Sequence, residues 1–157
     1  MIDALQDFTS SLPEFLQWFG VMLIAAIPFV ESYFGAAVGV IVGINPVIAI
    51  GAAVVGNIVS MLIFVLSAHG IREKATRGKA PKELSPRRAK LKERFDRYGV
   101  PGVSLLGQLA LPSQITSAAM VSFGAPKNQV ILWQVISIIM WGIIFGVLAT
   151  LGVSVLR

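Results

Sequence analysis

Only 13% of the 157 residues are charged and 55% are apolar, which excludes an ordinary soluble domain, where roughly 25% are charged. The net charge of +5 is concentrated in residues 72–98, a basic stretch of the kind that marks the cytoplasmic side of a membrane rather than a nucleic-acid site. The chain has no cysteine, so a disulfide framework and a thiolate metal site are excluded as well.

Residues 1–27 are predicted to form an N-terminal helical region. The segment 15–27 is apolar, and Trp18 is placed like an interfacial anchor. Pro28 lacks an N–H and disfavours helical backbone at the residue before it. We therefore predict that the helix ends there.

Glu31 is the single formal charge in residues 15–71, which must enter a bilayer at least once because about 20 apolar residues cross its core. Acids at that depth usually face a protein interior or a watery cavity and carry function. Burial disfavours the charged form, so we expect Glu31 to exchange protons. Two alternatives stay open: a neutralised structural acid, and a permanently charged partner for a cationic drug.

Residues 28–71 are predicted to form a first hairpin followed by a transmembrane helix. The Gly-rich segment 29–44 is short for a full span and better suited to a re-entrant hairpin. After the turn at Asn45 and Pro46, residues 46–71 are long enough for one span. Asn57 lies in the middle of it and is expected to bond a neighbouring helix, with a place in the site as the alternative. Small residues at every fourth position offer a close-packing face: Ala52, Gly56 and Ser60.

Residues 72–99 hold eleven Lys or Arg against four Asp or Glu. A basic loop is followed by an amphipathic cytoplasmic helix, with Ser85 as its N-cap and Gly99 just beyond its end. Its basic face suits anionic lipid headgroups. The residues predicted to contact them are Arg87, Arg88, Lys90 and Arg94.

Residues 100–157 are predicted to form a second hairpin and helix, with Pro112 breaking the first piece. That piece is polar for its expected depth, and its polar residues could line a site or bond neighbouring helices. The site candidates are Gln108, Ser113, Gln114 and Thr116. In the following helix, Gly142 and Gly146 offer a second face for close contact, so we expect a homodimer.

The two halves repeat one order of elements: a segment broken by proline and glycine, a turn, and a long helix. Pro28 matches Pro112, and Gly43 matches Gly124. Interrupted segments at corresponding places of two halves point to a binding site at a repeat interface. The predicted fold is thus an all-α integral membrane protein, an inverted repeat of re-entrant hairpin plus transmembrane helix.

The stretch IPFVESYFGAAVGVIVGINPVIAIGAAVVGN resembles the P-x-x-E…G…G-x-N-P…G-N pattern of the small multidrug export protein family. The stretch YGVPGVSLLGQLALPSQITSAAMVSFGAPK is similar to the second hairpin of that family and of the wider DedA/VTT superfamily. The resemblance implies oppositely oriented re-entrant hairpins and a role in transport or lipid handling, including flipping of polyprenyl-phosphate carrier lipids. Gln108 and Gln114 stand where DedA-type members have arginines, and Ser32 and Tyr33 stand where an Arg usually follows the acid.

These features favour a membrane transporter, a proton-coupled carrier or flippase for a lipid-like or amphiphilic substrate. With one His, no Cys and one buried acid, the chain lacks the pairs that serine or metal catalysis needs, so we expect no enzyme, cofactor or metal. A non-transporting membrane scaffold is the alternative. We place the chain in a bacterial cytoplasmic membrane, as a multi-pass protein with lipids, protons and substrate as its partners.

Overall fold

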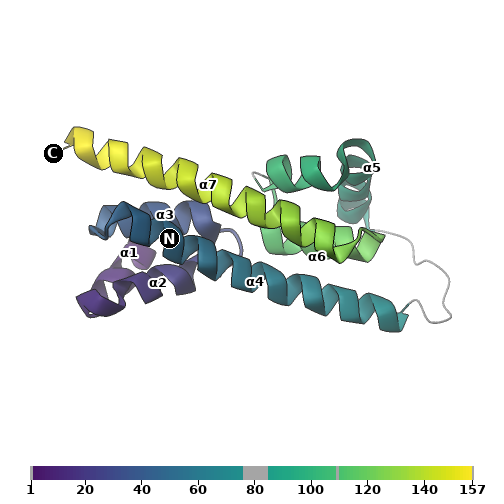
Figure 1. Cartoon of the computed structure of the whole chain (residues 1–157), viewed down its shortest axis with the longest axis horizontal. Helices are drawn as coiled ribbons and strands as arrows, with labels where there is room; N and C mark the ends of the chain where they lie inside the picture. Colours follow the sequence, from purple (N-terminus) through teal and green to yellow (C-terminus); the bar gives the residue numbers. More distant parts are fainter. Residues whose placement is uncertain (1, 76–84, 109, 157) are drawn as a thin grey trace. The chain divides into compact units, whose positions relative to one another are not determined.

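The computed structural model describes residues 2–75, 85–108 and 110–156, and this part of the chain is all-helical, as predicted (Figure 1). It divides into two compact units: unit 1 holds Met1–Ser60 and Ile138–Arg157, and unit 2 holds Met61–Ser137. The elements are α1 (Ile2–Ser11), the short 3-10 helix η1 (Glu14–Leu16), α2 (Gln17–Ala25), α3 (Glu31–Val42), α4 (Pro46–Ala75), α5 (Pro86–Gly107), α6 (Ser113–Phe123) and α7 (Lys127–Leu156).

In unit 1, α3 packs closely between α2 and the first half of α4. Gly35 lies against Ala25 of α2, and Gly39 lies against Val21, four residues earlier on α2, so these two helices are antiparallel. On its other side Gly39 meets Ala49 of α4. A Cβ on Gly35 would stand 2.7 Å from the Ala25 Cβ, and one on Gly39 would stand 2.7 Å from the Ala49 Cβ. The absence of a side chain at these two glycines thus allows α3 to approach its neighbouring helices this closely.

The predicted break at Pro28 is confirmed, because α2 ends at Ala25 and α3 begins at Glu31. The first hairpin, however, has other bounds than predicted. Residues 31–42 form one unbroken helix, and its antiparallel arm is α2 rather than a second arm within residues 29–44. The apolar segment before Pro28 therefore belongs to the hairpin.

The glycines of the two faces that we predicted to contact a second copy of the chain pack instead against other helices of unit 1. Gly142 of α7 lies against Ser32 of α3 and Val54 of α4, and Gly146 meets Ile50. Gly56 of α4 faces the backbone of α2. These glycines pack the chain against itself, so they are not available for a partner.

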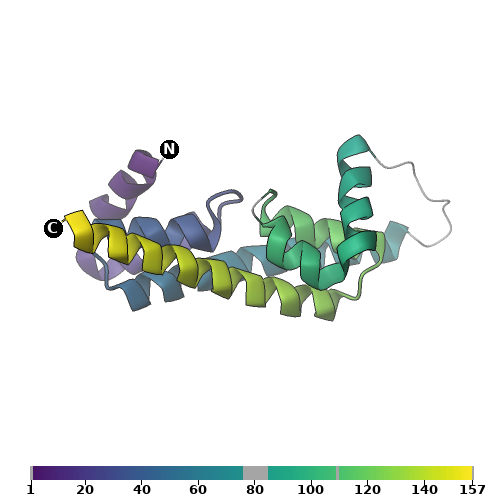
Figure 2. The same ribbon diagram turned by 90° about the horizontal axis from the view of Figure 1, so that it is seen from above.

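In unit 2, α5 consists of two helical parts that meet at Gly99, whose backbone is non-helical (φ 67°, ψ −174°). Figure 2 shows the two parts at a steep angle to each other. The predicted end of the amphipathic helix at Gly99 is confirmed, and so is its start at Ser85, with Pro86 in the first turn. The predicted basic loop lies mostly outside the described residues.

Helices α3 and α6 end in the same way. Gly43 (φ 102°) and Gly124 (φ 109°) both adopt the left-handed conformation that glycine allows. In each turn the next residue's N–H reaches back five residues: Ile44 to the Gly39 carbonyl and Ala125 to that of Met120, both at 3.0 Å. The residues matched from the sequence thus occupy equivalent positions in two similar turns.

Among the described residues, two helices are long and apolar enough to cross a membrane, over residues 46–74 of α4 and 127–155 of α7, each 29 residues. Only 28% and 22% of their most apolar windows are buried, whereas the core helix of a soluble protein would be mostly buried. Exposed apolar helices of this length are consistent with contact to lipid. The other apolar helices, with 9 residues in α2 and 12 in α3, are too short to cross alone.

Candidate functional site

The turn between α2 and α3 holds a strained backbone. Phe29 (φ 74°) and Glu31 (φ 54°) are the two non-glycine residues with positive φ in the described part of the chain. Left-handed backbone costs such residues about 1–2 kcal/mol each. Ser60 of α4 anchors the turn by donating to the Ala26 carbonyl at 2.7 Å. Strain of this kind persists where surrounding contacts impose it, and it concentrates at functional sites.

Glu31 is fully buried at the start of α3. A helix N-terminus carries partial positive charge, which favours a carboxylate there. The next residue, Ser32, donates to the Ile138 carbonyl of α7 at 2.8 Å and so ties this end of α3 to another helix of unit 1. The structure thus places the predicted acid inside the protein, at a point held by several elements.

Asn57, the other predicted site residue of unit 1, is also fully buried, on α4. Ser32 and Ser60 are buried as well, and the sequence analysis did not include them among the site residues. Their signal was present, because each polar residue stands in an otherwise apolar helix. Unit 1 therefore holds one buried acid and several buried polar groups.

The four polar candidates of unit 2 are all buried. Thr116 donates to the backbone carbonyls of Pro112 (3.1 Å) and Ser113 (3.2 Å), at the start of α6. Ser113 donates to the Gln114 side chain at 3.4 Å. The proline break thus places several polar side chains together at one helix end.

Helix α7 contributes two buried residues that the sequence analysis missed, Gln134 and Ser137. Ser137 donates to the Gln108 Oε1 at 2.7 Å, and the Gln134 Nε2 donates to the Thr116 Oγ1 at 3.2 Å. Their spacing of three places both on one face of an apolar helix, a signal that was available. Together with the predicted residues they form one polar cluster in unit 2.

This polar cluster has unused hydrogen-bonding capacity. Three buried polar atoms have no hydrogen-bond partner among the described residues: the Gln108 Nε2, the Gln134 Oε1 and the Oγ of Ser104, which precedes Gln108 by four residues. A buried polar atom left in that state costs about 1–3 kcal/mol. Such groups therefore favour an incoming polar ligand or water.

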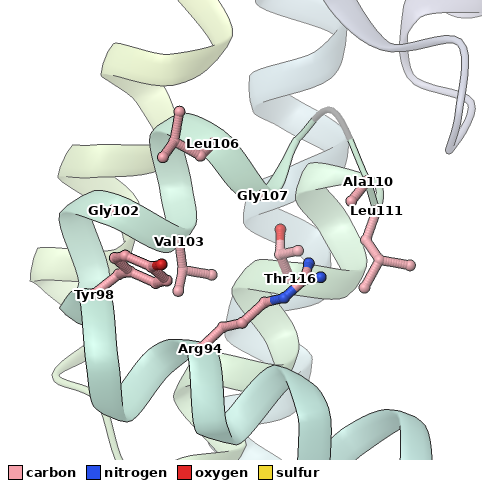
Figure 3. Close-up of a pocket in the computed structure, with 9 residues that line it drawn as sticks. All are labelled: Arg94, Tyr98, Gly102, Val103, Leu106, Gly107, Ala110, Leu111 and Thr116. Carbon is pink, nitrogen blue, oxygen red and sulfur yellow. The ribbon is translucent and has the colours of Figure 1, made fainter.

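A cavity of about 280 Å³ lies in unit 2, beside the polar cluster, and Thr116 belongs to both. In Figure 3 the Arg94 side chain extends from α5 towards Thr116 of α6, and Tyr98 lies beside it. The apolar part of the lining includes Val103 and Leu106. The cavity therefore combines a cation, hydroxyl groups and apolar walls.

The predicted headgroup residues lie on the first part of α5. Lys90 and Arg94 are exposed there, while the side chains of Arg87 and Arg88 lie outside the described part. Arg94 forms no ion pair with any described residue, unlike Lys92, which pairs with Asp96 at 2.6 Å. Arg94 is thus the basic residue of this face that the cavity brings next to a predicted site residue.

The predicted site residues fall into two groups. Glu31 and Asn57 belong to unit 1, and the four polar candidates of the second half belong to unit 2. In the described part of the chain, the all-helical architecture, the two exposed apolar helices of spanning length and the buried polar groups of both units are consistent with a membrane protein.

Residues 31–144 match the sequence model of the family described as "Putative small multi-drug export protein". The match covers well over half of the chain, so the chain belongs to this family, and the predicted resemblance to small multidrug export proteins is confirmed. The resemblance to the wider DedA/VTT superfamily stays a prediction. The family's name describes an exporter, a transporter rather than an enzyme. No curated protein and no solved structure matches the chain.

Proposed function

We propose that this protein is a proton-coupled carrier for an amphiphilic or lipid-like substrate, with Glu31 as the titrating group. The observation that carries this proposal is the complete burial of Glu31 in a chain of exposed apolar helices. Burial disfavours the charged form of a carboxyl group, whereas the start of a helix favours it, so a carboxyl group in such a place is suited to exchanging a proton or a cation. The family's name, which describes export, supports a transporter.

The substrate class follows from the lining of the unit 2 cavity. An amphiphile has a polar head and an apolar tail, and this cavity offers Arg94 and Thr116 to a head and Leu106, which is 64% exposed, to a tail. The unused donor of Gln108 and the unused acceptor of Gln134 add capacity for polar groups. A polyprenyl-phosphate lipid, the class implied by the DedA/VTT resemblance, has this chemistry, and an amphiphilic drug is the alternative.

The proposal includes two re-entrant hairpins related as an inverted repeat. About 20 residues are needed to cross a bilayer core. Helices α2, α3 and α6 have 9, 12 and 11 residues, so each hairpin would return to the side it entered. The similar turns at Gly43 and Gly124 support a common origin of the two halves. The excess of basic residues supports a cytoplasmic position for the first part of α5, in keeping with a bacterial cytoplasmic membrane.

Self-association to a homodimer belongs to the same proposal. Because the glycine faces are occupied within unit 1, a dimer would use the exposed apolar faces of the long helices instead. Val59 of α4 and Leu148 of α7 are more than half exposed and belong to these faces.

The test replaces Glu31 by Gln, which keeps the size of the side chain and removes its titration. Purified protein in liposomes with an imposed pH gradient is supplied with a fluorescent polyprenyl phosphate or a fluorescent amphiphilic drug, and transport is measured across a pH series. Wild-type protein should show gradient-driven transport that Glu31→Gln abolishes. Asp7→Asn, which removes an exposed carboxylate from α1 of the same unit, should behave as wild type.

The outcome separates three roles of Glu31. If Glu31→Gln keeps the wild-type rate and pH dependence, the carboxyl is structural and the proposed mechanism is wrong. If wild-type transport does not depend on the pH gradient but is still lost in Glu31→Gln, Glu31 holds a fixed charge against a cation and does not couple protons. If wild-type protein transports neither probe, the non-transporting scaffold becomes the better hypothesis.

A further inference from the structure

Unit 1 contains a second cavity that the proposed carrier mechanism does not use. Its volume is about 560 Å³, and it lies where η1 and the start of α2 face the turn between α3 and α4. One side is lined by Glu14, Phe15, Gln17 and Trp18, and the other by Gly43, Ile44, Asn45 and Ile48. Sites for drug-sized ligands have volumes of about 300–1,000 Å³.

Two aromatic side chains form an exposed wall of this cavity. Phe15 is 73% exposed and Trp18 is 44% exposed. The indole N–H of Trp18 donates to the Phe15 carbonyl at 2.8 Å, and its ring packs edge-on against Phe19 with the centroids 5.9 Å apart. These contacts hold the indole in place before any ligand arrives. An aromatic face attracts a cation that lies within about 6 Å of its centre.

The charges around the cavity favour a cation. Glu14 is an exposed carboxylate in the lining, and residues 1–60 contain four acidic side chains and no Lys, Arg or His. The C-terminal end of α3, which also lines the cavity at Gly43, adds the partial negative charge of the helix dipole. No basic side chain of that segment is present to neutralise Glu14.

We propose that this cavity binds an organic cation with a large apolar surface, such as a quaternary ammonium or phosphonium ion. Glu14 would neutralise the charge and Trp18 would supply a cation–π contact, while Phe15 and Ile48 cover the apolar part. This site is independent of the Glu31 mechanism, because it uses other residues and is measured as equilibrium binding.

The experiment measures binding of tetraphenylphosphonium to the full chain in nanodiscs of zwitterionic lipid by calorimetry, with empty nanodiscs subtracted. We expect saturable binding that Glu14→Gln weakens about fivefold, since one opposite charge near 4 Å in water contributes about that factor. Trp18→Leu should weaken it about two- to fivefold, and Trp18→Phe by less, because phenylalanine retains a π face. Size-exclusion profiles verify that each variant is folded.

Three controls separate a built site from general attraction. Tetraphenylborate has the same shape with the opposite charge and, titrated by itself, should not show saturable binding. Asp7→Asn removes a carboxylate outside the cavity, and Phe64→Leu removes an exposed aromatic ring from α4; both should bind as wild type. The proposal is overturned if Glu14→Gln binds as wild type, if Asp7→Asn weakens binding as much as Glu14→Gln, or if tetraphenylborate, titrated by itself, binds as tightly as tetraphenylphosphonium. Should Trp18→Leu fail to fold, Glu14→Gln and Trp18→Phe decide the question.

Discussion

The close packing of α4 on α2 can be tested by adding a methyl group at Gly56, with Gly51 on the same helix as the control. A Cβ on Gly56 would overlap the carbonyl group of Met22, whereas a Cβ on Gly51 would meet no atom within 4 Å. Overpacking costs about 1–3 kcal/mol, and we take about 3 because the obstacle is backbone and cannot rotate away. Because alanine has a higher helix propensity than glycine, the substitution also stabilises the helix by about 1 kcal/mol. Gly56→Ala should therefore destabilise the protein by about 2 kcal/mol.

The assay is thermal unfolding of purified protein in detergent, followed by helical circular dichroism. For a chain of this size each kcal/mol shifts the midpoint Tm by about 2–4 °C, so Gly56→Ala should lower Tm by about 4–8 °C. Gly51→Ala gains the propensity without the clash and should raise Tm by up to about 2–4 °C. Equal Tm values for the two variants would refute the close approach of α4 and α2 around the Glu31 turn.

Two further predictions test the topology and the polar cluster. A reporter fused after Arg157 should lie outside the cell, because re-entrant hairpins leave only α4 and α7 to cross; a cytoplasmic reporter would instead favour four ordinary spans. Ser137→Ala removes the donor to Gln108 and should lower Tm by about 2–4 °C, for a loss of about 1 kcal/mol, whereas Ser154→Ala, an exposed site on the same helix, should leave Tm unchanged. Equal effects of the two serine variants would contradict a buried network.

Much of the fold was predictable because it depends on local backbone chemistry. Pro28 and Pro112 end helical segments wherever they stand, and Gly43 and Gly124 adopt left-handed turns that other residues disfavour. The long apolar run of residues 46–71 likewise predicted α4, which spans Pro46–Ala75. These properties act within a few residues, so a single sequence reveals them.

The pairing of helices was not predictable in the same way. The arm that packs on α3 is α2, a choice made by the close approach of Gly35 to Ala25 across the turn. The sequence also offered Gly142 and Gly146 equally to a partner chain and to the protein itself, and the structure places them against α3 and α4. Small-residue spacing predicts a close contact without saying which helix makes it.

In the polar cluster, too, local features were predictable from the sequence and the contacts between distant residues were not. Gln108 and Thr116 drew attention because they are polar in an apolar segment, yet their partners Ser137 and Gln134 lie 29 and 18 residues further along the chain. Such long-range pairs follow from the tertiary structure. The strain at Phe29 and Glu31 was hidden for the same reason, since neither residue favours positive φ and the surrounding contacts impose it.

The distribution of charge has two physical consequences that one substitution can separate. The absence of Lys and Arg from residues 1–60, against eleven in residues 72–98, orients the chain in the membrane and also leaves Glu14 without a basic neighbour in its segment. Orientation depends on Lys and Arg, and Asp and Glu contribute little to it. Glu14→Gln should therefore leave the orientation unchanged while it weakens cation binding. If that variant lost binding because its orientation had changed, the asymmetry would serve topology alone, and the cavity of unit 1 would need another explanation.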